Sequence, residues 1–267
     1  MSDAPIGIFD SGIGGLTVAR AIYDRLPGES TLYFGDTARV PYGPKSPDTV
    51  RRYSREILHW LLGQGVKLVV VACNTSTAHA LGILQAESPV PVIGVIEPGA
   101  RAAVANTRGG AVGVIGTAGT VASEAYPKAI HALAPALRVE QVPCPLFVPL
   151  VEEGWFDHPA AELIAKEYLE PLRRTGIDVL VLGCTHYPLL KPLLGRVMGP
   201  AVRLIDSAEE TARAVEQTLQ SHALAAPLGK VVSHRYVVSD DEPRFRQVAA
   251  RFLGGKLGPA EVVALGG

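Results

Sequence analysis

Two stretches with one plan decide the fold: GVKLVVVACNTSTAHAL at residues 65–81 and GIDVLVLGCTHYPLLKPLL at residues 176–194. Each starts with a glycine and an apolar run, places a cysteine where the run ends, and continues through small polar residues into a helical pattern. A strand that leads directly into a helix is the repeating unit of parallel α/β sheets, whose ligand sites collect at the carboxyl ends of the strands. The sequence therefore predicts two similar α/β units that present Cys73 and Cys184 at equivalent places.

The alternation of short apolar runs with longer helical segments extends over the whole chain, which predicts an α/β fold with parallel sheets. A looser echo relates IGIFDSGIGGLTVARAIY (6–23) to VGVIGTAGTVASEAY (112–126). We expect strands at residues 6–10, 31–36, 68–73, 90–95, 111–116, 138–143, 178–184, 202–206 and 234–239. We expect helices at residues 15–26, 47–64, 76–87, 97–106, 121–134, 159–175, 188–198 and 207–222.

The repeat, together with the late strand-like run HRYVVS (234–239), predicts how the chain is divided. Two units of similar design indicate two similar parallel-sheet domains, and the late run would return to the first of them. We therefore expect residues 1–97 together with 207–267 to form the first α/β domain, and residues 98–206 to form the second.

The charge and the apolar runs exclude several classes of protein. The chain has 25 basic and 26 acidic residues, a net charge of −1, and no basic stripe, so we expect no nucleic-acid partner. Its longest apolar runs, such as LVVVAC, are much shorter than a membrane span. The N-terminus MSDAPIGIFDSG lacks the pattern of a signal peptide. We therefore expect a cytoplasmic protein without a membrane partner.

The three cysteines are Cys73, Cys144 and Cys184. An odd number of widely spaced cysteines argues against a disulfide framework. They are either buried apolar residues or working thiols, and a helix N-terminus can lower the pKa of a thiol. Zinc ligation by Cys184 and His186 with a further cysteine is an alternative, but the paired spacing of zinc sites is absent from the sequence. We therefore expect two working thiols and no metal.

A glycine-rich turn follows the first expected strand in FDSGIGGLTV (9–18) and could hold an anion on its backbone N–H groups. A dinucleotide fingerprint, with Asp36 as the ribose-binding acid, is one alternative. It fails on pattern, because Thr17 stands where the third glycine belongs and Asp10 enters the turn. A plain tight turn is the other alternative.

Two further groups could take part in chemistry. His186, two residues after Cys184, is either a general acid–base or a histidine satisfied by local capping. Glu152 and Glu153 either place a carboxylate near Cys73 or form a solvated pair in a loop.

Taken together, five motifs resemble bacterial glutamate racemase, in the cofactor-independent aspartate/glutamate racemase family. The resemblance covers about residues 6–208, and its motifs are specific in combination. They are FDSGIGGLTV (9–18), YFGDTARVPYG (33–43), ACNTSTA (72–78), GTAGTVASEAY (116–126) and GCTHYPLL (183–190).

The resemblance implies two domains related by pseudo-twofold symmetry, an active site in the cleft between them, and deracemisation of glutamate for peptidoglycan. It makes Cys73 and Cys184 the catalytic thiols. It also implies assisting residues at Asp10, Glu152 and His186. The implied substrate contacts are Asp10, Ser11, Tyr42, Gly43, Asn74, Thr75, Thr117, Thr120, Thr185 and His186.

Racemisation removes the α-proton from one face and returns a proton to the other, so one thiol on each face suits the reaction. We expect Asp10 and Glu152 to exchange protons on the Cys73 side, and His186 on the Cys184 side. We expect no cofactor, because no lysine lies in the motifs beside the cysteines to bind pyridoxal phosphate, and Lys67 stands at the start of a strand.

Two other functions remain open from the sequence. One is aspartate racemase of the same architecture, which activity toward L-aspartate would reveal. The other is a non-catalytic amino-acid-binding or gyrase-interacting protein, although binding alone does not need two matched thiols. A homodimer is compatible with any of these functions.

Overall fold

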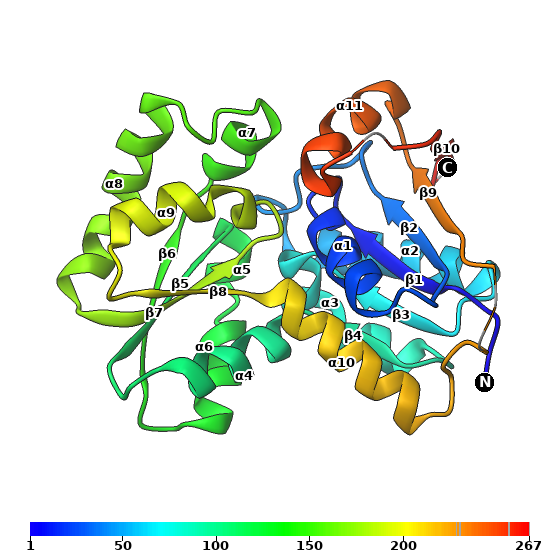
Figure 1. Ribbon diagram of the computed structural model, residues 1–267, viewed down its shortest axis with the longest axis horizontal. Helices are drawn as coiled ribbons and strands as arrows, with labels where there is room; N and C mark the ends of the chain where they lie inside the picture. The colour runs from blue at the N-terminus through cyan, green and yellow to red at the C-terminus, as the bar shows by residue number, and fades with distance from the viewer. Residues whose placement is uncertain (228, 230, 256, 267) are drawn as a thin grey trace.

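The computed structural model describes residues 1–227, 229, 231–255 and 257–266, and shows two lobes, each built on one parallel sheet (Figure 1). In the first lobe, six parallel strands lie in the order β10-β9-β2-β1-β3-β4. Their bounds are β1 Ile6–Asp10, β2 Thr31–Gly35, β3 Leu68–Val71, β4 Val92–Gly94, β9 His234–Val238 and β10 Glu261–Val262.

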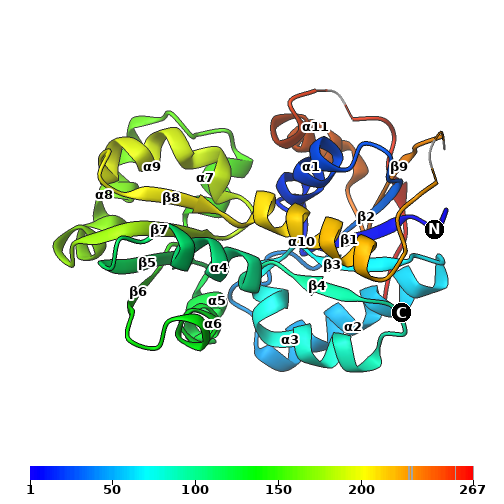
Figure 2. The ribbon, with the colours of Figure 1, turned by 60° about the horizontal axis from the view of Figure 1, so that its bottom comes forward.

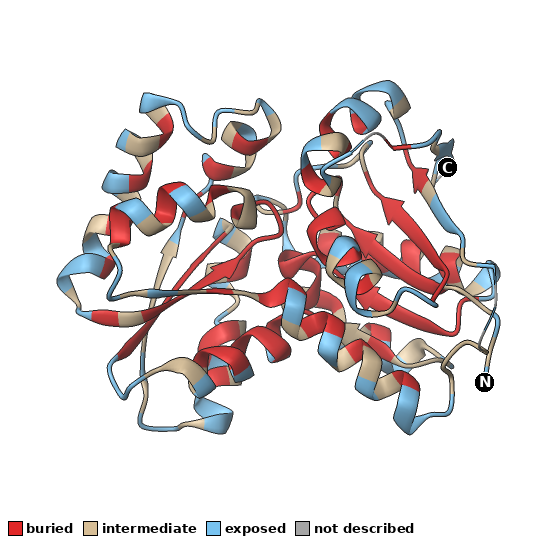
Figure 3. Ribbon diagram, in the orientation of Figure 1, coloured by how far each residue is buried: buried red, intermediate tan, exposed pale blue. Residues whose placement is uncertain are grey.

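In the second lobe, four parallel strands lie in the order β6-β5-β7-β8. Their bounds are β5 Ala111–Gly116, β6 Arg138–Pro143, β7 Ile177–Gly183 and β8 Arg203–Asp206. The central strands of both sheets are buried along their length, because helices cover both faces (Figure 3). The predicted α/β fold with two parallel-sheet domains is confirmed.

The two sheets share one strand order, which explains the repeat in the sequence. The order β2-β1-β3-β4 in the first sheet corresponds to β6-β5-β7-β8 in the second. The echo between residues 6–23 and 112–126 therefore relates β1 to β5. The stronger echo between residues 65–81 and 176–194 relates β3 to β7. Equivalent strands thus lead to Cys73 and Cys184.

Helices of the first lobe form two layers. One face of its sheet packs against α2 (Pro47–Gly63) and α3 (Asn74–Glu87). The other face packs against α1 (Leu16–Arg25), α10 (Ser207–Ser221) and α11 (Glu242–Leu253) (Figure 2). Helix α2, for example, buries an apolar stripe that includes Val50, Ile57 and Leu61, and this burial stabilises the lobe.

The second lobe has the same layered design. One face of its sheet packs against α4 (Ile96–Asn106) and α6 (Ala125–Leu133). The opposite face packs against α7 (Phe147–Glu152), α8 (Pro159–Arg174), the 3-10 helix η1 (Tyr187–Leu190) and α9 (Lys191–Met198). The short helix α5 (Ala118–Ala122) follows β5.

The chain changes sheet twice. It passes from β4 to β5 through α4, and from β8 to β9 through α10, which packs along both α1 and α4. These crossings support our proposal that residues 1–97 and 207–267 form one domain and residues 98–206 the other. Residues 228, 230, 256 and 267 of the first domain lie outside the described part of the chain.

Several elements differ from the sequence-based expectation. The single helix expected at 121–134 is interrupted, because Glu124 has a left-handed φ of 58° and α6 begins at the next residue. Helices α7 and α11 and strand β10 were not predicted from the sequence. Among the described residues, no helix has the length and apolar character needed to cross a membrane.

Candidate active site

Cys73 follows strand β3 and caps the N-terminus of α3. Its Sγ accepts a hydrogen bond from the Ser76 backbone N–H at 3.4 Å, and its thiol donates to Ser11 Oγ at 3.6 Å. Only 6% of the residue is exposed. The Cys73 thiol therefore lies at the carboxyl edge of the sheet in the first lobe.

Cys184 follows β7 at the equivalent edge of the second lobe. Its Sγ lies 3.9 Å from Nδ1 of His186, and Nε2 of the same imidazole lies 3.0 Å from Oε1 of Glu152. His186 can therefore connect the sulfur of Cys184 to the Glu152 carboxylate.

Both cysteines line one cavity of about 30 Å³ between the lobes, which has room for a water molecule or two. Most of the predicted substrate contacts lie in the same lining, which also includes Val40, Pro41 and Val148. The predicted residues that the structure brings together here are Ser11, Tyr42, Gly43, Cys73, Asn74, Thr75, Thr117, Cys184, Thr185 and His186.

Asp10, Thr120 and Glu152 lie outside that lining. The Asp10 carboxylate is buried behind it and accepts hydrogen bonds from the Gly12 N–H at 2.9 Å and from the Thr185 hydroxyl at 3.4 Å. The Thr120 hydroxyl is buried and contacts the hydroxyl groups of Thr75 and Thr117. These two residues therefore support groups that face the cavity.

The expected position of Glu152 beside Cys73 is wrong. Glu152 ends α7 in the second lobe, and its carboxylate faces His186. It also lines an adjoining cavity of about 400 Å³ with Pro41, Gly43 and Thr117. The sequence could not reveal this placement, because it depends on the short helix α7, which positions Glu152 in the second lobe.

Tyr42 is 1% exposed, and its hydroxyl donates a hydrogen bond to the buried carboxylate of Asp36. The loop that contains Tyr42 packs closely against the second lobe at Gly43. A Cβ atom on Gly43 would lie 2.8 Å from Cβ of Thr117, so only glycine allows this approach. Tyr42 therefore lines the cavity with its hydroxyl engaged elsewhere.

Asn74 carries an available donor. Its Oδ1 accepts a hydrogen bond from the Tyr126 hydroxyl at 2.8 Å, which connects the two lobes. Its Nδ2 is buried and has no hydrogen-bond partner among the described residues. An unpaired buried donor costs free energy, and an anion in the cavity would satisfy it.

Burial and the charge of Asp10 raise the pKa of Cys73 to about 11. The N–H of Ser76 and the hydroxyl of Ser11 act in the opposite direction and are outweighed. The helix N-terminus thus does not produce the lowered thiol pKa that the sequence suggested for Cys73. Cys73 therefore keeps its proton near neutral pH.

Burial lowers the pKa of His186, but its interactions with Cys184 and Glu152 outweigh burial and raise that pKa to about 10. Burial raises the pKa of Glu152, but the hydrogen bond and charge of His186 hold it below its usual value. Burial also raises the pKa of Asp10, more than the charge of His186 lowers it. His186 and Glu152 therefore form an ion pair beside Cys184.

Two alternatives from the sequence, a dinucleotide site at the glycine-rich turn and a zinc site at the cysteines, gain no geometric support. The Asp10 carboxylate accepts the N–H of Gly12 in the glycine-rich turn, and the phosphates of a dinucleotide would have to bind at the same place. Cys144 lies outside the cavity, with its thiol directed toward the carbonyl of Val142. Within the described ranges, no group of three or more His, Cys, Asp and Glu side chains could hold a metal ion.

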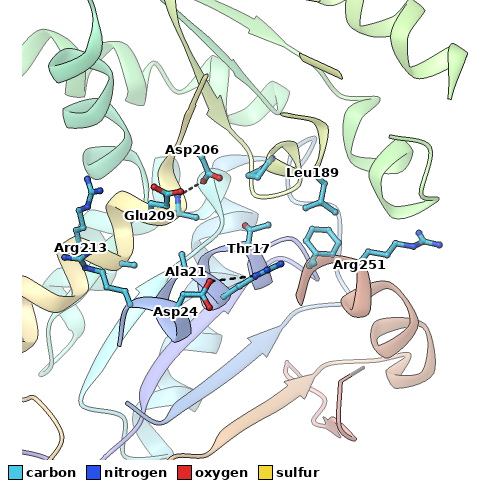
Figure 4. A pocket seen from close by; sticks show the side chains of 14 residues that line it. Thr17, Ala21, Asp24, Leu189, Asp206, Glu209, Arg213 and Arg251 are labelled. Atoms are coloured by element: carbon cyan, nitrogen blue, oxygen red, sulfur yellow. Dashed lines mark hydrogen bonds and ion pairs between the residues drawn. The ribbon is translucent and has the colours of Figure 1, made fainter. Parts of the chain in front are cut away.

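A larger cavity of about 600 Å³ lies between α1, η1, α10 and α11 (Figure 4). Its lining includes Arg20, Asp24, Glu209 and Arg213, and neither Cys73 nor Cys184. The matched thiols therefore assign the candidate active site to the small cavity between the lobes.

Comparison with known proteins agrees with this geometry. The family model described as Asp/Glu/Hydantoin racemase matches residues 16–215. Glutamate racemase of Geobacter metallireducens is 57% identical over 260 residues, which cover 97% of this chain and 96% of that protein.

Two solved structures are also similar. Glutamate racemase from Francisella tularensis in complex with D-glutamate has a TM-score of 0.93 and 37% identity, over 99% of this chain and 98% of that one. Glutamate racemase from Thermus thermophilus in complex with β-chloro-D-alanine has a TM-score of 0.89 and 47% identity, over 99% and 98%.

The fold has two parallel-sheet lobes with one thiol from each lining a common cavity, and the chain belongs to the Asp/Glu/hydantoin racemase family. It is therefore an enzyme of the isomerase class. Within the family, the curated relatives that it matches at 47–57% identity are glutamate racemases.

Proposed function

We propose that this enzyme interconverts L- and D-glutamate, with Cys73 and Cys184 acting on opposite faces of the α-carbon. One observation carries the proposal: equivalent strands of two opposed sheets end in these thiols, and both line one cavity. A substrate held between them exposes one face to each lobe. One sulfur removes the α-proton and the other returns a proton, so the product has the opposite configuration.

The surroundings of the two thiols differ in a way that suits this exchange. The pKa of about 11 keeps Cys73 protonated, so it is ready to donate a proton. We assign removal of the α-proton to Cys184, because the His186 imidazole lies 3.9 Å from its sulfur and is held there by the Glu152 carboxylate. In the reverse direction the roles exchange, with His186 and Glu152 assisting Cys184, and Ser11 and Asp10 lying behind Cys73.

Removal of the α-proton places charge on the substrate carboxylate. Donors fixed around the cavity stabilise that charge more strongly than they stabilise the ground state. We assign this role to the Asn74 amide, whose Nδ2 is unpaired among the described residues, with the hydroxyl groups of Thr75 and Thr117. The Thr185 hydroxyl donates its proton to Asp10, so Thr185 lines the cavity without this role. Thr120 acts through its contacts with Thr75 and Thr117.

A cavity of about 30 Å³ is far too small for an amino acid, so the lobes open to admit substrate. The adjoining cavity of about 400 Å³ is the entrance, and the loop of Pro41, Tyr42 and Gly43 forms the edge between the two cavities. Closure around the substrate then excludes water, which strengthens the interactions with the carboxylate.

We propose that the reaction needs no cofactor and supplies D-glutamate for peptidoglycan in the cytoplasm. The lysine nearest in sequence to Cys73, Lys67, lies at the opposite end of β3, where its Nζ is 2.6 Å from the Glu29 carboxylate. A reducing compartment keeps Cys73 and Cys184 as free thiols. A homodimer stays a prediction.

The proposal is tested by incubating the purified, dialysed enzyme with L-glutamate and, separately, with L-aspartate. We expect the optical rotation to decay to zero with L-glutamate, without added pyridoxal phosphate or metal. Faster decay with L-aspartate would favour the aspartate racemase alternative. Inactivity toward both would favour a binding or gyrase-interacting protein.

A further inference from the structure

Helix α11 of the first lobe contacts the end of α7 in the second lobe. Arg251 donates a hydrogen bond from Nη1 to the backbone carbonyl of Glu152. Nη2 of Arg244 lies 3.4 Å from the Glu153 carboxylate and 4.0 Å from that of Glu152. Two arginines of the first lobe therefore bind the segment of the second lobe that carries Glu152.

The same helix contacts the partner of Glu152. The ring of Phe252 packs edge-on against the imidazole of His186, with 5.5 Å between ring centroids and 90° between planes. Phe252 is 2% exposed. Figure 4 shows Arg251 extending away from Asp24, consistent with its bond to the Glu152 carbonyl. Helix α11 thus touches both members of the His186–Glu152 pair.

These contacts affect position more than stability. The Arg244 side chain is 56% exposed, and exposed ion pairs contribute little to folding because water and salt screen them. The position of Glu152 matters more, because its Oε1 holds the His186 ring beside Cys184. A small displacement of a reacting group can slow a reaction considerably.

The contacts of α11 with Glu152 and His186 affect the surroundings of Cys184 and not those of Cys73. The hydrogen-bond partners of Cys73 are the Ser11 hydroxyl, in the turn between β1 and α1, and the Ser76 N–H, in α3. Loss of the α11 contacts should therefore slow proton transfer at Cys184 and leave the transfer at Cys73 unchanged.

We propose that Arg244 and Arg251 are positioning residues that hold the Glu152–His186 pair beside Cys184 when the lobes close. This inference rests on the proposed function, in which Cys184 exchanges a proton with one face of glutamate. Neither arginine touches the reacting atoms; both act through the placement of Glu152.

The test compares R244Q, R251Q and the double variant with wild type. The readouts are kcat, KM and the primary deuterium isotope effect with D- and L-[2-²H]glutamate. We expect kcat of the double variant to fall about tenfold with little change in KM. The isotope effect should increase only for the enantiomer whose α-hydrogen faces Cys184, because that transfer becomes rate-limiting, and should decrease for the other enantiomer.

R246Q is the matched control, because Arg246 lies on the same helix and pairs with Glu242 at 3.5 Å. It should behave as wild type. R251K retains a donor for the Glu152 carbonyl and should recover part of the lost rate. Melting temperatures of all variants check that each one folds.

Three outcomes separate the claims. A double variant that matches R246Q would overturn the positioning role. So would equal changes in isotope effect for both enantiomers, because general loosening of the cleft would affect both thiols. Inactivity of the wild-type enzyme toward glutamate would instead overturn the proposed function, and the positioning role with it.

Discussion

Gly14 of the first lobe lies directly against His186 of the second: a Cβ atom on Gly14 would come within 2.4 Å of the imidazole Nδ1 and 2.3 Å of Thr185 Oγ1. The glycine-rich turn therefore serves a close approach between lobes. In the first turn of α1, which follows Gly14, the Thr17 hydroxyl donates to the Thr185 carbonyl at 3.1 Å. The turn thus forms part of the surface that holds His186 in place.

Replacement of Gly14 by alanine should displace His186 from Cys184. We expect kcat/KM for glutamate to fall about 100-fold, because the added methyl group overlaps the imidazole and the Thr185 hydroxyl. Racemisation kinetics measure the effect. Gly28→Ala is the control, since no atom lies within 4 Å of a Cβ there, and it should retain full activity. Equal activity of the two variants would contradict the close approach.

The stability of the enzyme should fall as the pH rises above neutrality. The pKa of His186 is about 10 in the folded enzyme, against 6.5 for an ordinary histidine. Between these values the folded state holds a proton that the unfolded state releases. The stabilising contribution is therefore complete below about pH 6.5 and is lost as the pH rises toward 10.

Urea unfolding at about pH 7 and about pH 9 measures this loss of stability. Both pH values lie below the range in which ionisation of Cys73, whose pKa is about 11, dominates the pH dependence of stability. H186N should show a smaller loss than wild type, because asparagine does not titrate. H131N, at an exposed position, should show the wild-type loss. A wild-type enzyme that gained stability over this interval would contradict the His186–Glu152 ion pair.

Asn74→Ala should weaken stabilisation of the charged substrate carboxylate. The unpaired Nδ2 donor belongs to a residue that lines the cavity, and a hydrogen bond to a charged group contributes roughly 1.5–3 kcal/mol, or about 10- to 100-fold in kcat/KM. Asn106→Ala is the matched control, because the Asn106 amide donates to the Ala102 carbonyl in α4. An unchanged kcat/KM in Asn74→Ala would remove Asn74 from the substrate contacts.

Much of the fold was predictable because the strands are continuous apolar runs. The run at 68–71 and its counterpart at 177–183 each form an interior strand of one sheet, and the cysteines follow these strands in sequence. Helix α11 was also predictable, because Phe245, Val248, Ala249 and Phe252 recur at helical spacing after the cap Asp241.

The remainder depended on tertiary contacts that no local pattern encodes. Helix α7 has six residues and contains Pro149, so its helix propensity is weak, yet it places Glu152 beside His186. The hydroxyl of Tyr42 is engaged by Asp36, a pairing that the spacing of the motif does not reveal. The pKa of Cys73 is set by burial, which outweighs the helix N-terminus.

The central claim is that Cys73 and Cys184 act on opposite faces of one substrate. In C73S or C184S, a serine hydroxyl replaces a thiol, and its proton is much harder to remove near neutral pH. Racemisation should fall at least about 1,000-fold in either variant. Each variant should still remove the α-proton that faces its remaining thiol.

The most direct measurement is HCl elimination from the two enantiomers of threo-3-chloroglutamate by C73S and C184S, with C144S as the control because Cys144 lies outside the cavity. We expect each variant to eliminate from one enantiomer only, the two variants to prefer opposite enantiomers, and C144S to act on both. The same preference in C73S and C184S, or equal damage in C144S, would contradict the opposed placement of the two thiols.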